Sequence, residues 1–171
     1  MRCQNYRHTF TVSCIVIAAS IFSACSPRMY TYNGAVEIRK DLMIQLDQGR
    51  QQGVWKTNEL SITYKYQMTP ASLKLEGNTE LVGGFAIGFS WIRRLTVYLL
   101  FLDKQGIVIE SPLVYYAGDI RAVDMIPMDF EKNILVPEGA CAISFAYDGE
   151  LTGTGTEDIT PYSIWHTPPR P

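Results

Sequence analysis

The clearest pattern in the chain is a strict alternation of apolar and polar residues over 60–68, LSITYKYQM. Successive side chains of a strand point to opposite faces of its sheet, so a period of two predicts a half-buried β-strand. Thr69 and Pro70 interrupt the pattern, and the alternation resumes in ASLKLEG, residues 71–77. Together these two stretches predict a β-hairpin.

The next stretch keeps the same period. In GGFAIGFSW, residues 83–91, bulky residues alternate with small ones, which predicts a strand whose glycine face is approached closely by a neighbour. RLTVYLLFL, residues 94–102, is apolar on both faces and predicts a central strand. DKQG should form a turn in which Asp103 bonds the backbone two residues on and Gly106 has a positive φ. Residues 107–110 should then pair back.

Two further stretches complete the strand pattern. AVDMIPMDF, residues 122–130, contains Pro127, which lacks the N–H that a central strand needs, so we place this stretch on an edge. ACAISFAYDG, residues 140–149, alternates large residues, beginning with Cys141, with small ones. Strands at this spacing predict a mainly β protein with a single antiparallel β-sandwich domain over residues 34–171.

The start of this domain is harder to interpret. Apolar residues between Gly34 and Leu46 could form one face of a helix, so residues 34–52 predict a short N-terminal helix or an irregular segment. GRQQG, residues 49–53, is interpreted as a break in regular structure. Residues 25–33 show no period and are expected to be a tether.

Charge is distributed unevenly near the N-terminus. Arg7 and Arg28 bracket a stretch without any charged residue, and within it lies the apolar run 10–24. A basic start, an apolar run and small residues are the order of a secretory signal peptide, which we assign to residues 1–24. The remaining chain has 13 Lys and Arg (15 minus 2) against 17 Asp and Glu, a formal net charge of −4. This acidity, without a basic stripe, argues against a nucleic-acid partner.

The apolar run ends at a cysteine. Phe22-Ser23-Ala24-Cys25 resembles the lipobox of bacterial lipoproteins, although that family prefers Leu, Val or Ile where this chain has Phe22. The resemblance implies cleavage before Cys25 and lipidation of its sulfur. Ser26 is not the Asp that this family associates with inner-membrane retention, which implies an outer-membrane location. An uncleaved membrane helix and an ordinary signal peptide remain alternatives.

A second resemblance concerns the domain itself. The aliphatic strands around the turn in VYLLFLDKQGIVIE, residues 97–110, resemble a hairpin of immunoglobulin-like envelope modules, including the FxLYD type. The resemblance covers residues 58–149. It implies a binding or structural role in the cell envelope and brings no catalytic residues.

Candidate chemistry is sparse. Cys141 should be an inert core thiol, and His166 is the single histidine after residue 24, so neither a metal site nor a catalytic triad is expected. Ile164 and Trp165 should pack against the sandwich and leave His166 partly exposed. The acidic residues of DGELTGTGTEDIT, residues 148–160, lack a calcium-binding register and are interpreted as a solvated loop, so we expect no metal and no cofactor.

Aromatic residues are the remaining candidates. Tyr115 and Tyr116 are adjacent, so in a strand one of them must leave the core. These tyrosines, with Trp165 and His166, are the candidate ligand contacts. Three functions follow: a non-enzymatic envelope lipoprotein that binds a partner, most simply a protein; a module that binds glycan or cell wall; and an envelope hydrolase. The hydrolase would use Glu131 with one of three aspartates, Asp119, Asp124 or Asp129.

Overall fold

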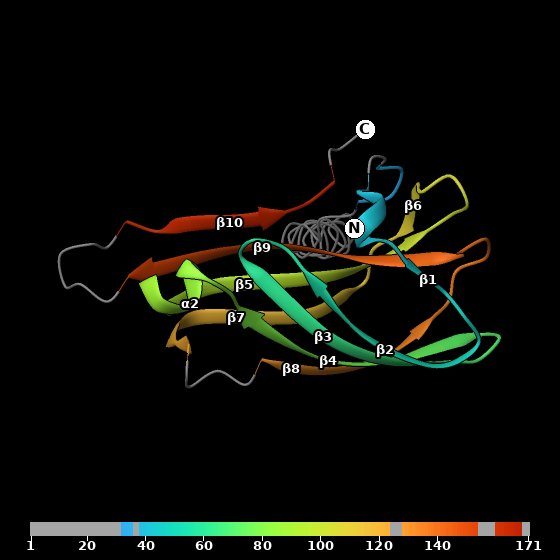
Figure 1. Cartoon of the computed structure of the whole chain (residues 1–171), viewed down its shortest axis with the longest axis horizontal. Coiled ribbons are helices and arrows are strands. Elements are labelled where there is room, and N and C mark those ends of the chain that lie inside the picture. The colour runs from blue at the N-terminus through green and yellow to red at the C-terminus, as the bar shows by residue number, and fades with distance from the viewer. Residues whose placement is uncertain (1–31, 36–37, 124–127, 154–159, 169–171) are drawn as a thin grey trace, which may run out of the picture. The chain divides into compact units, whose positions relative to one another are not determined.

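The computed structural model describes residues 32–35, 38–123, 128–153 and 160–168. The elements are η1 (Lys40–Leu42), β1 (Ile44–Gln45), β2 (Gly49–Lys56), β3 (Leu60–Met68), β4 (Ser72–Leu81), α2 (Gly84–Gly88), β5 (Phe89–Leu102), β6 (Val108–Glu110), β7 (Leu113–Ala122), β8 (Asp129–Leu135), β9 (Ala142–Gly153) and β10 (Tyr162–His166) (Figure 1). Cys25, the predicted signal peptide (residues 1–24) and most of the predicted tether lie outside the described residues.

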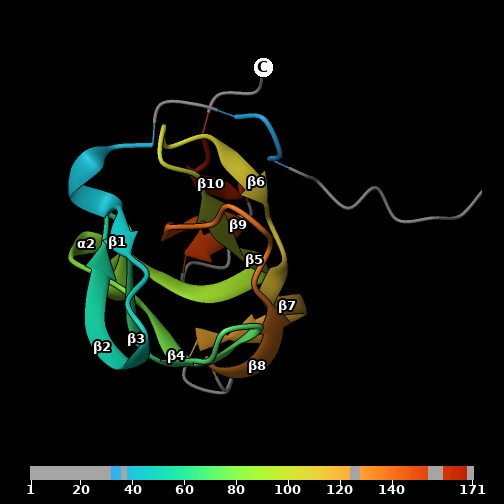
Figure 2. The same ribbon diagram turned by 90° about the vertical axis from the view of Figure 1, so that its right-hand side faces the viewer.

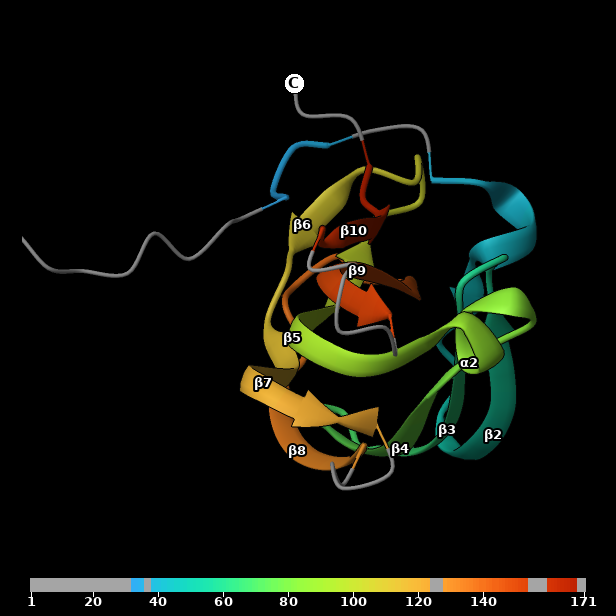
Figure 3. The same ribbon diagram turned by 90° about the vertical axis from the view of Figure 1, so that its left-hand side faces the viewer.

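The strands form two antiparallel sheets. In the six-stranded sheet, β5 pairs with β9 on one side and with β7 and β6 on the other, while β9 also pairs with β10 and β1. The four-stranded sheet has the order β2-β3-β4-β8. Figure 3 looks along the strands and shows these two layers, with β7 of one sheet next to β8 of the other. The predicted antiparallel β-sandwich is confirmed.

The best-patterned stretches fold as predicted. β3 covers residues 60–68, and β4 pairs with it in register from Met68 opposite Leu73. Their connection is closed by Thr69, whose N–H donates to the Ser72 carbonyl at 2.9 Å and whose hydroxyl lies 2.8 Å from the Ser72 hydroxyl. The apolar side chains of this hairpin point into the space between the sheets.

β5 is the predicted central strand. Leu95, Val97 and Leu99 face the four-stranded sheet in the main core, whereas Leu100 and Leu102 belong to a second buried cluster on the other side of the sheet. Residues 32–35 cover that second cluster and hydrogen-bond β6, with the Gly34 N–H 2.7 Å from the Val108 carbonyl (Figure 2). Burial on both faces explains why residues 97–102 of this strand are all apolar.

The predicted turn after β5 is confirmed as well. The Gln105 N–H donates to Asp103 Oδ1 at 2.8 Å, Gly106 has φ of +82°, and β6 pairs back onto β5. A short side-chain acceptor and a glycine in the left-handed region are the local requirements for such a turn.

The prediction of a strand across 83–91 is wrong in its first half. Residues 84–88 form the single-turn helix α2, and β5 begins only at Phe89. Phe85 and Phe89 are four residues apart, which a helical turn brings together, and their rings stack at 5.8 Å between centroids. Ile87, which alternation would bury, is 87% exposed.

Residues 49–53, interpreted as a break, form the start of strand β2. The segment lacks an apolar pattern because β2 is an edge strand and most of this end of it is exposed. The absence of a side chain at Gly53 leaves room for the Tyr64 ring, since a Cβ there would lie 2.6 Å from the Tyr64 hydroxyl. The only helical structure described before β2 is the short η1.

Two strand boundaries also differ from the prediction. The stretch 122–130 is not one strand: β7 ends at Ala122 and β8 begins at Asp129. β8 is an edge strand, and Pro127 lies outside the described residues. β9 continues to Gly153, so Asp148 and Glu150 lie on a strand and not in a loop. Cys141 precedes β9 and is half-buried rather than a core residue, with Sγ 3.7 Å from the Leu102 carbonyl oxygen.

Candidate functional site

Two predicted contact residues, Tyr116 and Trp165, lie on one face of the six-stranded sheet. Trp165 is opposite Asp148, Asp148 is opposite Thr96, and Thr96 is opposite Tyr116. Paired residues of neighbouring strands point to the same side of a sheet. The four therefore form one cross-strand row on the side that faces away from the four-stranded sheet.

Alternation along the strands decides which aromatic residues are exposed. Tyr115 points inward and is buried, whereas Tyr116 is 61% exposed. Ile164 fills the inward position of β10 and is buried, as predicted. Trp165 is 65% exposed, so the prediction that it also packs against the sandwich is wrong. One member of each adjacent pair has to leave the core, as expected for Tyr115 and Tyr116.

A third aromatic residue joins this face. Trp91 is 41% exposed and pairs with Thr152 and Ala122, while the neighbouring Ile92 is buried in the main core. The sequence prediction missed Trp91 because it lay at the end of the wrongly assigned strand. Its position directly before a core isoleucine is the same signal that marks Tyr116 after Tyr115.

Charged side chains lie between the rings. The Arg94 guanidinium hydrogen-bonds the Asp148 carboxylate, and its second terminal nitrogen is 3.9 Å from Glu150 Oε1. Arg94 is opposite Glu150 in the row next to Trp165 and Tyr116. A bulge in β5 between Ile92 and Arg94 adjusts the register so that Ile92 stays in the core.

The ring of Tyr116 lies along the sheet. A Cβ at Gly118 would be 2.5 Å from the Tyr116 hydroxyl and 2.8 Å from its Cζ, so the absence of a side chain at Gly118 makes room for the ring. We use the name aromatic face for Trp91, Tyr116 and Trp165 with Arg94, Asp148 and Glu150.

His166 lies on the opposite side of β10. Its ring packs against Trp55 at 5.4 Å and against Tyr147 at 6.1 Å. Burial lowers the pKa of His166, and the nearby Arg39 guanidinium lowers it further. His166 thus belongs to the edge of the core, and the structure separates it from its neighbour Trp165.

Polar groups around His166 are satisfied by each other. The Tyr147 hydroxyl donates to Glu59 Oε2 at 2.7 Å and lies 2.7 Å from Thr57 Oγ1; burial raises the pKa of Tyr147. The Trp55 indole N–H donates to the Leu42 carbonyl at 3.1 Å. This network connects η1 and β2 to the six-stranded sheet. We therefore assign these buried polar side chains a structural role.

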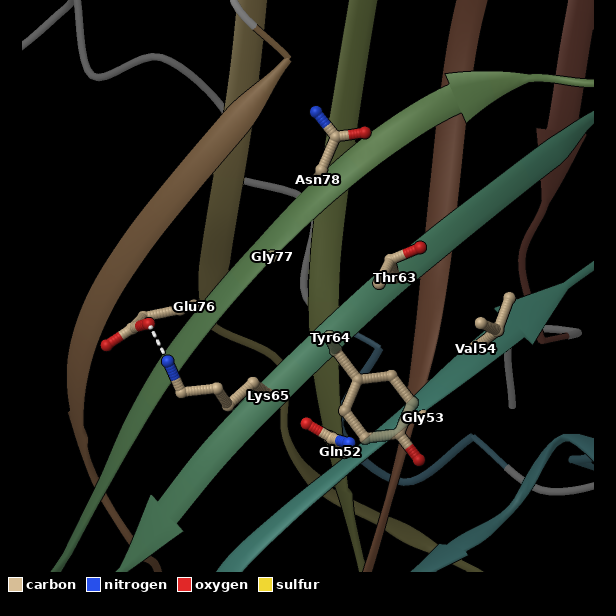
Figure 4. A pocket seen from close by; sticks show the side chains of 9 residues that line it. All are labelled: Gln52, Gly53, Val54, Thr63, Tyr64, Lys65, Glu76, Gly77 and Asn78. Carbon is tan, nitrogen blue, oxygen red and sulfur yellow. Dashed lines mark hydrogen bonds and ion pairs between the residues drawn. The ribbon is translucent and has the colours of Figure 1, made fainter.

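A second surface lies on the outer side of the four-stranded sheet. It is a shallow hollow of about 560 Å³ over β2, β3 and β4 (Figure 4). Val54, Thr63 and Asn78 lie along one side of it, and Gln52, Lys65 and Glu76 along the other. We call this surface the polar face.

Charges on the polar face are paired in a ladder. Lys65 Nζ is 2.8 Å from Glu76, Lys74 Nζ is 3.0 Å from the other oxygen of Glu76, and Lys74 also reaches Glu131 at 2.8 Å. The two lysines lower the pKa of Glu76 to about 2. Exposed pairs of this kind are common on solvated sheet faces and contribute little stability.

The structure describes the side chains of two of the four acidic residues considered for a hydrolase, and each of the two has a polar partner. Asp129 accepts a hydrogen bond from Asn78 at 2.9 Å, and Glu131 pairs with Lys74, both at the exposed surface of β8. Asp124 lies outside the described residues, and the side chain of Asp119 is not described. Glu157 and Asp158, from the predicted acidic loop 148–160, also lie outside the described residues.

Within the described ranges, no group of three or more His, Cys, Asp or Glu residues could hold a metal ion. The helices of this part of the chain are also too short to cross a membrane. Comparison with known proteins finds no matching family model, no matching curated protein and no matching solved structure.

Proposed function

We propose that this protein is a lipid-anchored, non-enzymatic binding protein of the bacterial outer membrane. In this proposal Cys25 carries the lipid, and the aromatic face of the sandwich contacts another envelope component. The single observation that carries the binding role is the exposure of Tyr116 and Trp165 at the two ends of one cross-strand row, with a hydrogen-bonded charge cluster between them.

The anchor is supported by the N-terminal pattern. A basic start, an apolar run and small residues before Cys25 are the features that a lipoprotein signal requires. A single acyl chain binds a membrane only marginally, whereas two or more chains hold it durably. A diacylated Cys25 would keep the domain at the membrane without any spanning helix.

The binding role is supported by the composition of the aromatic face. Soluble domains expose single apolar residues routinely, but tryptophan, tyrosine and arginine together are enriched at recognition surfaces. Trp91, Tyr116 and Trp165 are all exposed on the same side of one sheet, around Arg94. The polar face, by comparison, has its lysines and glutamates paired with each other.

Mass spectrometry of the N-terminal peptide from bacterially expressed protein tests the anchor. We expect cleavage before Cys25 and a mass increase equal to the acyl groups. Cys25→Ser should abolish both and release the protein from the membrane fraction. An unmodified Cys25 in the mature protein would overturn the lipoprotein part of the proposal.

Photocrosslinking in living cells tests the binding role. A photoreactive amino acid is placed at residue 116 or 165, and at Leu135, which is 77% exposed on the opposite sheet, as a matched control. We expect crosslinked products from the aromatic face and none from residue 135. Equal yields from both faces would contradict a binding role for the aromatic face.

A further inference from the structure

We infer that the aromatic face binds an uncharged glycan chain built of N-acetylhexosamine units. This inference rests on the proposed function, because it specifies the ligand of the same surface. The occupant is identified by its chemistry: apolar ring faces, hydroxyls and acetamide groups, repeated along a chain without net charge.

The first step of the inference concerns stacking. The C–H faces of sugar rings are apolar and pack on exposed aromatic rings, which offer a large contact area at a low cost in conformational entropy. Tyr116 lies along the sheet over Gly118, so a broad side of its ring is available. Trp165 offers a second ring in the same row.

The second step concerns hydrogen bonds. Carboxylates accept hydrogen bonds from sugar hydroxyls and from the acetamide N–H, and a guanidinium donates to the acetamide carbonyl. Asp148 lies between Trp165 and Tyr116 in their row, and Arg94 and Glu150 lie in the next row. Each of these side chains remains partly exposed.

The third step concerns charge. The positive charge of Arg94 is compensated by Asp148 and Glu150, so its guanidinium is not free to bind a phosphate or an anionic lipid. An anionic lipid headgroup would have to compete with Asp148 and Glu150 for the Arg94 guanidinium. A neutral, hydroxyl-rich chain satisfies these groups, which favours a glycan over a membrane surface.

The fourth step concerns length. Trp165 and Tyr116 lie on β10 and β7, three strand spacings apart, which is roughly 14 Å at the usual distance between strands. One sugar ring cannot contact both side chains. The face therefore fits a chain of several units that crosses the strands, and affinity should increase with chain length.

Calorimetry on the full-length protein in detergent micelles tests this inference, with the hexamer of N-acetylglucosamine as the probe. We expect binding of the hexamer, weaker binding of the dimer, and weaker binding of cellohexaose, which lacks the acetamide groups. Trp165→Ala and Tyr116→Ala should each weaken hexamer binding by about tenfold. Leu135→Ala, an exposed apolar residue on the other sheet, should leave it unchanged.

Thermal unfolding of each variant provides the control for folding, since Tyr116 and Trp165 are mostly exposed and their truncation should not change the fold. Absence of hexamer binding by the wild-type protein overturns the inference, as does equal binding by all variants. If Trp165→Ala lowers binding to phospholipid vesicles but not to the hexamer, the face contacts lipid and the inference is again overturned.

The outcomes separate this inference from the proposed function. A protein crosslinked at residue 116, combined with no hexamer binding, would retain the proposed function and overturn the glycan ligand. If calorimetry shows hexamer binding while mass spectrometry shows an unmodified Cys25, the glycan ligand is supported and the lipid anchor is overturned. Failure of both the crosslinking and the calorimetry would overturn both.

Discussion

The two outer faces of the sandwich differ although both are built from antiparallel strands. On the polar face, Lys65, Glu76, Lys74 and Glu131 neutralise each other in a ladder that needs no partner. On the aromatic face, large rings remain exposed at positions that the neighbouring core residues force outward. The two faces therefore differ in the type of side chain that remains exposed: charges paired with each other on the polar face, and aromatic rings on the aromatic face.

The largest effect is expected when the shared core is broken. Phe145, on β9, contacts Trp55 and Tyr64 of the other sheet, with ring centroids 5.7 and 5.9 Å apart. Phe145→Ala should lower the free energy of unfolding by about 3–5 kcal/mol and should unfold both faces in a single transition. Chemical denaturation followed by tryptophan fluorescence and by circular dichroism measures this. Two separate transitions would show that the sheets fold independently.

Acidification should affect the aromatic face more than the polar face. The pKa of His166 is below its usual value of 6.5, so its neutral form contributes stability that is present above pH 6.5 and is lost as the pH falls below it. The charged groups facing His166 are Arg39 and Asp41 from the η1 region and Glu59 from the β2–β3 connection.

Hydrogen exchange at pH 7 and pH 5, corrected for intrinsic rates, should therefore show reduced protection of β10 at the lower pH. His166→Phe keeps an aromatic ring without a titratable group and should remove this difference. Protection of β10 that does not change with pH in the wild-type protein would contradict the prediction.

A smaller effect on stability is expected at Gly118. Gly118→Ala should displace the Tyr116 ring, because the new Cβ would lie 2.5 Å from the end of that flexible side chain. The free energy of unfolding should change by less than about 1 kcal/mol, while hexamer binding should weaken. Thermal unfolding and calorimetry on the same sample separate the two effects. Unchanged binding would mean that the orientation of Tyr116 is irrelevant.

The smallest effect is expected on the polar face. Glu76→Gln removes the shared carboxylate of the ladder, yet exposed ion pairs contribute little, so hexamer binding and the melting temperature should be nearly unchanged. Glu76 itself should titrate near pH 2, and its contribution to stability should be lost as the pH falls from about 4.5 toward 2. A carboxyl titration by NMR that gives an ordinary value would contradict the ladder.

Local patterns predicted much of the fold. The hairpin 60–77 and the turn at Asp103 depend on neighbouring residues, so alternation and turn chemistry were sufficient. The α2 segment was mispredicted because its residues alternate in size as a strand would, while its conformation is favoured by contacts between Phe85, Phe89 and the distant Tyr162. β2 was missed because an exposed edge strand has no apolar period to detect.

The candidate site was predicted only in part. Adjacency of Tyr115 and Tyr116 correctly indicated that one ring leaves the core, and the same reasoning applied to Ile164 and Trp165 would have exposed Trp165. Alternation along β5 could not reveal Trp91, because the register of β5 on β9 shifts between Phe89 and Trp91. The ion pair of Arg94 with Asp148 could not be found, because 54 residues separate the two.

Side-chain periodicity and local backbone preferences specify which residues alternate, where the chain turns and that strands dominate, so these features can be predicted from the sequence. Which outward residues share a face depends on the pairing of distant strands. The register of β10 on β9, of β9 on β5 and of β5 on β7 places Trp165, Asp148, Thr96 and Tyr116 in one row. Register depends on how two distant strands fit over a common core, and a shift by one residue would turn these side chains to the other side.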